Sequence, residues 1–271
     1  MEKTKVLFIS QEISPYLPDT EMSSIGRYLP QGIQEKGKEI RAFMPKYGLV
    51  NERRNQLHEV IRLSGMNIII DDSDHSLIIK VASIQSARMQ VYFIDNDDYF
   101  QRKNMFADPD DGFYDDNDER AIFFTRGVIE TVKKLRWSPD IIHCHGWITS
   151  LVPIYIKKAF HDDPLFHDSK VIYSIYNDDF SGNLDLNFRK KLKLRGISDD
   201  DTKLVEEANF VNISKLAIEY SDGIIHGSNT INKDVESYIN NRKLPVLGYQ
   251  NDGEYLSAYS DFYDTIYKEN K

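Results

Sequence analysis

The chain has 271 residues, 41% of them hydrophobic, with a formal net charge of −9 and a sequence pI near 5.3. This length suits one large α/β domain or two small ones, and the acidic balance argues against a nucleic-acid partner. No apolar run reaches the roughly 18 residues that a membrane helix needs, and the N-terminal sequence lacks a signal-peptide pattern. The single cysteine, Cys144, excludes a disulfide framework within the chain, so we expect a soluble, cytoplasmic globular protein with no membrane partner.

Short apolar runs and helical patterns alternate at the start of the chain. Residues 6–10 predict a strand, 22–36 a helix ended by Gly37, and 39–43 a second strand, which together form one βαβ unit. Residues 62–94 then contain three strand-like runs with no helix between them: 66–70, 77–84 and 90–94. We expect these runs to form hairpins at one edge of the sheet.

The second half of the chain repeats the strand–helix alternation. Residues 117–135 predict a long helix, with Asp116 as an N-cap candidate and Glu119 three residues later. Further elements are predicted as strands at 140–143, 170–175 and 223–226 and as helices at 148–160, 206–220 and 233–239. Fully apolar strands such as "DIIHC" are typical of a parallel sheet covered on both faces.

These elements predict an α/β fold with a Rossmann-like, doubly wound, mainly parallel sheet and helices on both faces. We expect a single domain over residues 1–249, followed by a tyrosine-rich helical tail, 250–271, packed on the same domain. In such a sheet, ligands bind at the carboxyl ends of the strands.

The most suggestive strand end is "HCHGWITSLVP". We interpret His143 and His145 as pointing to opposite faces, so that only one of them enters a cleft. The spacing does not support a metal site, and a Cys–His nucleophile pair is disfavoured because Cys144 should be buried. A structural turn in which Trp147 packs under the following helix is an alternative that stays open.

Two polar segments offer other candidates. The segment "DPDDGFYDDNDE" fails the calcium-binding EF-hand template, because aligning Gly112 with the template glycine places Ala107 where the first aspartate belongs. We interpret it as an acidic loop before a helix. The segment "SIYNDDFSG" places Asn177, Asp178 and Asp179 after a strand, either as an Asx-type turn or as functional side chains.

Several segments match, in order, the motifs of one enzyme family. They are "EISPY" followed at family spacing by "LPQGI", then "EKGKEIRAFMPKYG", "VYFIDNDDYFQR", "DDNDERAIFFTRGVIETVKKLRWSPDIIHCHGW", "VIYSIYN" and "KLAIEYSDGIIHGSNT". The ordered set resembles the N-terminal catalytic domain of bacterial glycogen synthases and plant starch synthases, which are retaining glucosyltransferases. The resemblance implies the N-terminal half of a two-domain GT-B fold. It also implies ADP-glucose as the family's donor substrate, with no separate cofactor.

The chain departs from the family where the donor sugar nucleotide would bind. The family's K-T-G-G loop is replaced by Pro18, Asp19, Thr20 and Glu21, which contribute no lysine and two carboxylates that would repel a diphosphate. Gly146 stands for the aspartate of the family's H-x-H-D-W motif. Tyr176 stands for the histidine of T-I-H-N, whereas Asn177 is kept. The sequence also ends where the family's second, nucleotide-binding domain would begin.

The resemblance and these departures lead to two functional hypotheses, and whether the chain is an enzyme stays open. In the first, it is a catalytically incomplete domain of glycogen metabolism that binds α-glucan or has a regulatory role. In the second, it is the N-terminal subunit of a two-chain ADP-glucose-dependent glucosyltransferase, with a partner chain or a homodimer using the exposed cleft face. The ligand-binding candidates are Glu12, Tyr16, His143, His145, Trp147, Asn177 and Ser228. Tyr16, Trp147 and the tyrosine-rich tail could be glucan platforms or core residues.

Overall fold

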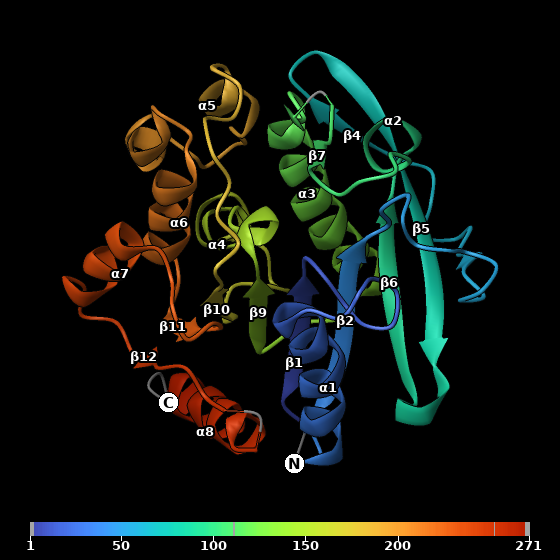
Figure 1. The fold of residues 1–271 in the computed structure, drawn as a ribbon, viewed down its shortest axis with the longest axis vertical. Coiled ribbons are helices and arrows are strands. Elements are labelled where there is room, and N and C mark those ends of the chain that lie inside the picture. Colours follow the sequence, from blue (N-terminus) through green and yellow to red (C-terminus); the bar gives the residue numbers. More distant parts are fainter. Residues whose placement is uncertain (1–2, 111, 252, 269–271) are drawn as a thin grey trace.

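The computed structural model describes residues 3–110, 112–251 and 253–268 (Figure 1). Its main strands are β1 (Lys5–Ser10), β2 (Glu39–Pro45), β4 (Met66–Ile70), β5 (Ser73–Ile84), β6 (Met89–Asp95), β9 (Ile141–His145), β10 (Lys170–Ile175) and β11 (Gly223–His226). The two-residue strands are β3 (His58–Glu59), β7 (Ala107–Asp108), β8 (Gly112–Phe113) and β12 (Val246–Leu247). The α-helices are α1 (Glu21–Glu35), α2 (Asp97–Phe100), α3 (Asn117–Leu135), α4 (Val152–Ile154), α5 (Phe188–Lys191), α6 (Phe210–Glu219), α7 (Lys233–Asn240) and α8 (Tyr255–Lys268).

The main sheet has the strand order β12-β11-β10-β9-β1-β2-β6-β5-β3. Neighbouring strands from β12 to β6 pair in parallel, which confirms the predicted mainly parallel sheet. β5 pairs antiparallel with β6, β3 and β4, so the predicted hairpins do lie at one edge. The parallel centre is buried on both faces, because every residue of β9 is inaccessible to solvent.

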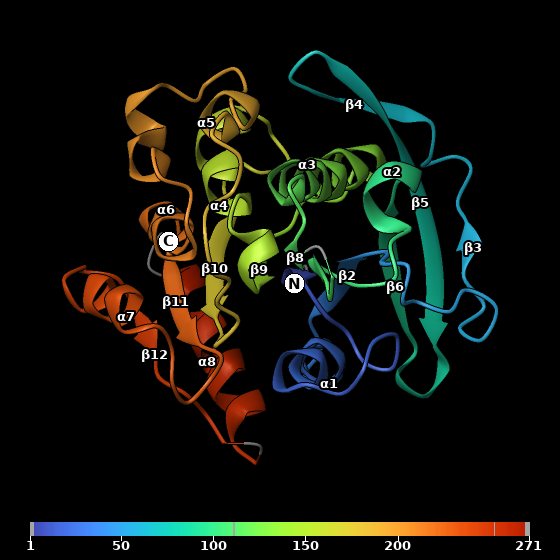
Figure 2. The ribbon, with the colours of Figure 1, turned by 45° about the horizontal axis from the view of Figure 1, so that its top comes forward.

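Helices cover both faces of this sheet. Figure 2 shows α1 and α8 on one side and α3, α4 and α6 on the other. α1 begins in the loop after β1, and its apolar residues Ile25, Leu29 and Ile33 are buried. The turn after α1 uses Gly37 at φ +94°, a left-handed conformation that favours glycine. This arrangement confirms the predicted α/β class and places the first turn of α1 at the carboxyl end of β1.

Three local expectations need correction. Asp116 does not cap α3 with its side chain, because both its carboxylate oxygens accept hydrogen bonds of 2.5 Å from Arg102. The helix expected over 148–160 is split into a 3₁₀ turn (Trp147–Thr149), α4 and a π-helical turn (Tyr155–Ala159). The helix expected from residue 206 starts at Phe210, because the Asn209 side chain accepts a hydrogen bond from the Asn212 N–H.

The acidic segment before α3 forms no regular metal loop in its described part. β7 and β8 pair as a short antiparallel hairpin, and Asp111 between them lies outside the described residues. Within residues 3–110, 112–251 and 253–268, no group of three or more His, Cys, Asp or Glu side chains is placed to hold a metal ion. None of the helices in this same part of the chain combines the length and apolarity needed to cross a membrane. The cytoplasmic location stays a prediction.

α8 is packed against the sheet face that also carries α1. The Tyr263 hydroxyl is hydrogen-bonded to His143 Nδ1 at 2.6 Å, and Ile266 lies against Gly223 of β11. Leu256 lies very close to Gly32 of α1: a Cβ added to Gly32 would be only 2.4 Å from Leu256 Cδ1. The tail therefore shares the buried core of the sheet, and the division at residue 249 stays a prediction.

Replacing Tyr263 by phenylalanine should destabilise the fold, because it leaves the buried His143 Nδ1 without its partner. The expected loss is about 1–3 kcal/mol in the free energy of unfolding, measured by urea denaturation. The matched control is Tyr28→Phe on α1, whose ring is 56% exposed and which should change stability by less than about 0.5 kcal/mol. Equal stability of the two variants would contradict a docking role for this hydrogen bond.

Candidate functional site

The loop from β1 to α1 closes the start of the helix with its own side chains. It contains a cis Ser14–Pro15 peptide bond and an exposed Pro18. The Thr20 hydroxyl accepts a hydrogen bond from the Ser23 N–H at 2.9 Å, while Ser23 Oγ accepts one from the Thr20 N–H at 2.8 Å. This capping box uses amide donors that a phosphate would otherwise contact at a helix N-terminus.

Carboxylates surround the same helix end. Glu12 Oε2 accepts a hydrogen bond of 2.6 Å from the Thr20 hydroxyl. Glu21, the first residue of α1, accepts one of 2.8 Å from Ser228 Oγ in the loop after β11. The positive end of the α1 dipole stabilises both carboxylates. These bonds join the loops that follow β1 and β11 into one polar wall.

A cleft of about 430 Å³ lies at the carboxyl ends of β1, β10 and β11. Its ten described lining residues comprise three carboxylates, neutral polar side chains, Met22 and Tyr176, but no lysine or arginine. The polar members with the clearest contacts are Glu12, Thr20, Glu21, Asn177, Asp178 and Ser228. Such a lining disfavours an anionic ligand and offers many hydrogen-bond acceptors to a neutral one.

Asp178 is the carboxylate of this cleft with the most perturbed acidity. Burial raises its pKa to about 7, and the nearby charges of Glu12 and Asp179 act in the same direction. A hydrogen bond from the Trp147 N–H to Asp178 Oδ2, 2.9 Å long, opposes the rise without cancelling it. Asp178 therefore changes its protonation state near neutral pH, which is uncommon for a carboxyl group.

The two histidines of "HCHGW" point to the same face, so the expectation that they diverge is wrong. Residues two apart in a strand share a face, and the ring centroids of His143 and His145 lie 3.9 Å apart. His143 is hydrogen-bonded to Tyr263 and Ser174, and His145 Nδ1 to the Tyr176 hydroxyl at 2.9 Å. Both side chains are fully buried under α8, outside the lining of the cleft.

The two aromatic candidates are also core residues in this structure. Tyr16 is 6% exposed and packs edge-on against Phe93, with ring centroids 4.9 Å apart. Trp147 is 2% exposed and packs between Phe106 and Phe180. Neither residue lines the cleft, so the structure favours the core alternative over the glucan platform at both positions. The alternative interpretation of Trp147, as part of a structural turn, agrees with this packing.

The cleft thus combines three of the sequence candidates, Glu12, Asn177 and Ser228, from three separate strand ends. Tyr176 contributes to its lining as well, whereas Pro18 and Gly146 do not. Sequence reasoning identified Thr20 and Glu21 only as residues that replace glycines and did not predict that they line the cleft. The sequence pattern Thr20-x-x-Ser23, which is typical of a capping box, could have indicated that Thr20 and Glu21 lie at the start of a helix.

Comparisons with known proteins match nearly the whole described chain to one family. A family model described as the starch synthase catalytic domain matches residues 5–245. The chain belongs to this family.

Curated relatives agree with that assignment. The glycogen synthase of Chlorobium limicola is 35% identical over 219 residues, which cover 80% of this chain and 44% of the relative. The glycogen synthase of Chlorobaculum tepidum is 40% identical over 174 residues, 64% of this chain and 36% of the relative. The chain therefore spans less than half the length of these glycogen synthases.

A solved starch synthase has the same fold. The catalytic domain of starch synthase IV from Arabidopsis thaliana, solved with ADP and acarbose bound, superposes with a TM-score of 0.73 at 18% identity. The match covers 92% of this chain and 52% of that one, as expected for one half of a GT-B starch synthase domain.

A side chain at the position of the family's H-x-H-D-W aspartate would meet close contacts here and an unfavourable backbone conformation. Gly146 adopts φ +84°, and a Cβ on it would lie 2.8 Å from Gln11 Oε1 and 2.9 Å from Met22 Sδ. Gln11 is held there by a backbone hydrogen bond from its N–H to the His145 carbonyl at 3.0 Å. The starch synthase motif is therefore altered in its packing as well as in one residue type.

Tyr176 fills the position of the family's T-I-H-N histidine. Its ring is buried, and a Cβ on Gly227 would lie 2.6 Å from the ring. Its hydroxyl is committed to His145. The side chain thus closes the space between the ends of β10 and β11.

Replacing Gly146 by aspartate should therefore destabilise the protein without creating transferase activity. A side chain at positive φ and two contacts under 3.0 Å predict a loss of about 2 kcal/mol or more in unfolding free energy, measured in urea. The matched control is Gly248→Asp, because a Cβ there has open space around it. A Gly146→Asp variant as stable as this control would show that Gln11 and Met22 move aside freely.

The buried histidines predict a loss of stability in acid. Burial lowers the pKa of His145 to about 3, whereas in the unfolded chain it takes up a proton below about pH 6.5. Its contribution is therefore complete above pH 6.5 and falls as the pH drops towards 3, by about 2 kcal/mol between pH 7 and pH 5. Asp178, whose pKa is raised, contributes a slope of opposite sign.

Comparison with His145→Gln isolates the histidine, because Asp178 is present in both proteins. Between pH 7 and pH 5, the fall in unfolding free energy should be about 2 kcal/mol smaller in the variant than in the wild type. Tyr28→Phe leaves both buried histidines in place and serves as the control. Identical pH profiles for wild type and His145→Gln would contradict a neutral, buried imidazole at this position.

Proposed function

We propose that this starch synthase-type domain acts in glycogen or α-glucan metabolism by binding glucan at the strand-end cleft, and that it does not by itself transfer glucose from ADP-glucose. The observation that carries the proposal is the charge of the cleft: its ten described lining residues include three carboxyl groups, of which Asp178 is partly protonated near neutral pH, and no lysine or arginine. A neutral polyhydroxylated chain suits this surface, whereas a nucleotide diphosphate is repelled by it.

Glucose transfer depends on stabilisation of the leaving phosphate. Retaining transfer without a covalent intermediate requires cationic groups or amide donors where negative charge develops on the departing diphosphate. Here Pro18 and Glu21 occupy the loop that carries the family's lysine and glycine, and Thr20 caps the helix amides. Loss of one such donor commonly costs a factor of about 10²–10³ in rate, and this loop has lost several.

The hydrogen-bonding groups of the cleft suit a glucan. Glu12 and Asp178 present acceptor oxygens, while exposed Asn177 presents both a donor and an acceptor in the same cleft. Sugar hydroxyls can satisfy these groups without adding charge. No cofactor is needed for this activity.

A second candidate is the N-terminal subunit of a two-chain glucosyltransferase, with a nucleotide-binding partner or a second copy docked on the cleft face. It is favoured by the family match and by the glycogen synthases among the curated relatives. It ranks second because Pro18, Gly146 and Tyr176 lie on this chain, where a partner cannot replace them. The acidic lining would still face the donor diphosphate.

Electrophoresis through glycogen-containing gels, together with transfer of labelled glucose from ADP-glucose, tests the proposal. We expect glycogen to retard the wild type. Transfer should be at least about 10³-fold below that of a glycogen synthase relative assayed in parallel. Asn177→Ala should reduce the retardation, and Asn55→Ala, at a half-buried position outside the lining of the cleft, should not.

Each other outcome has a definite meaning. Migration unaffected by glycogen would refute glucan binding. Transfer by the chain alone at a rate close to the relative's would refute catalytic incompleteness. Transfer that appears only when a second, nucleotide-binding chain is added would replace the first candidate by the second.

A further inference from the structure

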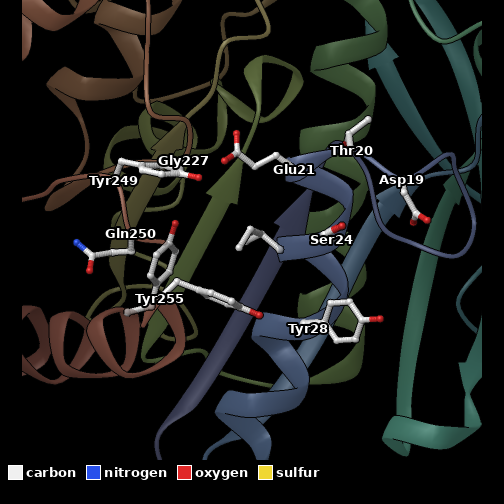
Figure 3. Close-up of a pocket in the computed structure, with 11 residues that line it drawn as sticks. Asp19, Thr20, Glu21, Ser24, Tyr28, Gly227, Tyr249, Gln250 and Tyr255 are labelled. Carbon is white, nitrogen blue, oxygen red and sulfur yellow. The ribbon is translucent and has the colours of Figure 1, made fainter. Parts of the chain in front are cut away.

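A second hollow, of about 560 Å³, lies beside the strand-end cleft, between α1 and the start of α8 (Figure 3). Figure 3 shows Glu21, Ser24 and Tyr28 of α1 on one side, with Tyr249, Gln250 and Tyr255 across from them. Four tyrosines, Tyr28, Tyr249, Tyr255 and Tyr259, contribute to its lining, and we call it the tyrosine groove. Thr20 and Glu21 line both this groove and the cleft, so the two hollows adjoin at the start of α1.

One wall of the tyrosine groove comes from outside the segment that matches the starch synthase family. The family match ends at residue 245, whereas Tyr249, Gln250, Tyr255 and Tyr259 follow it. The groove therefore lies between a helix within the family match and a segment that follows it.

This wall is held in place by packing. Leu256 contacts Gly32 of α1 so closely that a Cβ there would lie within 2.4 Å of it. Tyr255 packs edge-on against Tyr259, with ring centroids 6.1 Å apart, and Tyr263 anchors the helix on His143. The tyrosine side chains are thus preorganised, and binding requires little ordering of the wall.

The groups in the groove suit a neutral sugar ring better than a charged ligand. Aromatic rings offer flat apolar surfaces, and Gln250 and Ser24 offer hydrogen-bond donors and acceptors. The carboxylates already have partners: Asp19 accepts a hydrogen bond of 2.7 Å from Ser14 Oγ, and Glu21 one of 2.8 Å from Ser228 Oγ. The α1 dipole offsets part of their charge, so they need no cation.

We propose that the tyrosine groove is a second carbohydrate site, which binds glucose units of the same α-glucan chain whose neighbouring units occupy the strand-end cleft. This inference rests on the proposed glucan binding and extends it to residues that the family match does not contain. Tyr28 and Tyr255 supply the stacking faces, and Glu21 and Gln250 accept and donate hydrogen bonds to sugar hydroxyls.

The experiment is calorimetric titration of the full chain with maltoheptaose. Tyr28→Ala and Tyr255→Ala should each weaken binding by about tenfold, and Ser24→Trp, which fills the groove, by at least as much. Tyr28 is 56% exposed, so its replacement should leave the fold intact, as circular dichroism and urea denaturation can verify. Tyr238→Ala on α7 removes a half-buried tyrosine far from the groove and should leave affinity unchanged.

The possible failures are distinguishable. No binding of maltoheptaose or glycogen by the wild type would refute the proposed function itself. Wild-type binding that is weakened by Asn177→Ala but not by Tyr28→Ala, Tyr255→Ala or Ser24→Trp would refute the tyrosine groove alone. Titration with choline tests a cation in the aromatic site, and tighter, Tyr28-dependent binding of choline than of maltoheptaose would also refute it.

Discussion

The hydrogen bonds of Thr20 at the start of α1 determine the chemistry of both hollows in this protein. Thr20 caps the helix through Ser23 and donates to Glu12, while the adjacent Glu21 reaches Ser228 after β11. A helix start at the end of a parallel strand is ordinarily suited to phosphate. Here side chains occupy its amides and add negative charge, so the inherited position favours a neutral ligand.

The packing around this helix end extends the same constraint to the neighbouring strands. Gln11 and Met22 fill the space beside Gly146, and Tyr176 fills the space beside Gly227. These contacts belong to the buried layer that also contains His143, His145 and Tyr263. A single substitution that restores the family residue at Gly146 or Tyr176 therefore meets side chains that already pack at these positions.

Sequence patterns predicted the framework well because strand and helix periodicity are local properties. The strands 170–175 and 223–226 were predicted to the residue, and the edge hairpins followed from three strand-like runs without a helix. The wrong predictions concerned the direction in which a side chain points and the group to which it is hydrogen-bonded. Two histidines separated by one residue had to share a face, and Asp116 bonded to Arg102 rather than to its helix. The roles of Tyr16 and Trp147 stayed open in the sequence, because an aromatic residue suits a core and a sugar equally well.

By itself, the sequence determined the α/β class, the order of the elements, the family and the loss of the donor loop's lysine and glycines. All of these are local or ordered along the chain. Only the tertiary structure decided that Glu21 lines the cleft, that a side chain at Gly146 would meet Gln11 and Met22, and that Tyr28 and Tyr255 line one groove. Each of these three features brings together residues more than a hundred positions apart in the sequence. Such contacts depend on how the helices pack on the sheet, and no local sequence pattern predicts that packing.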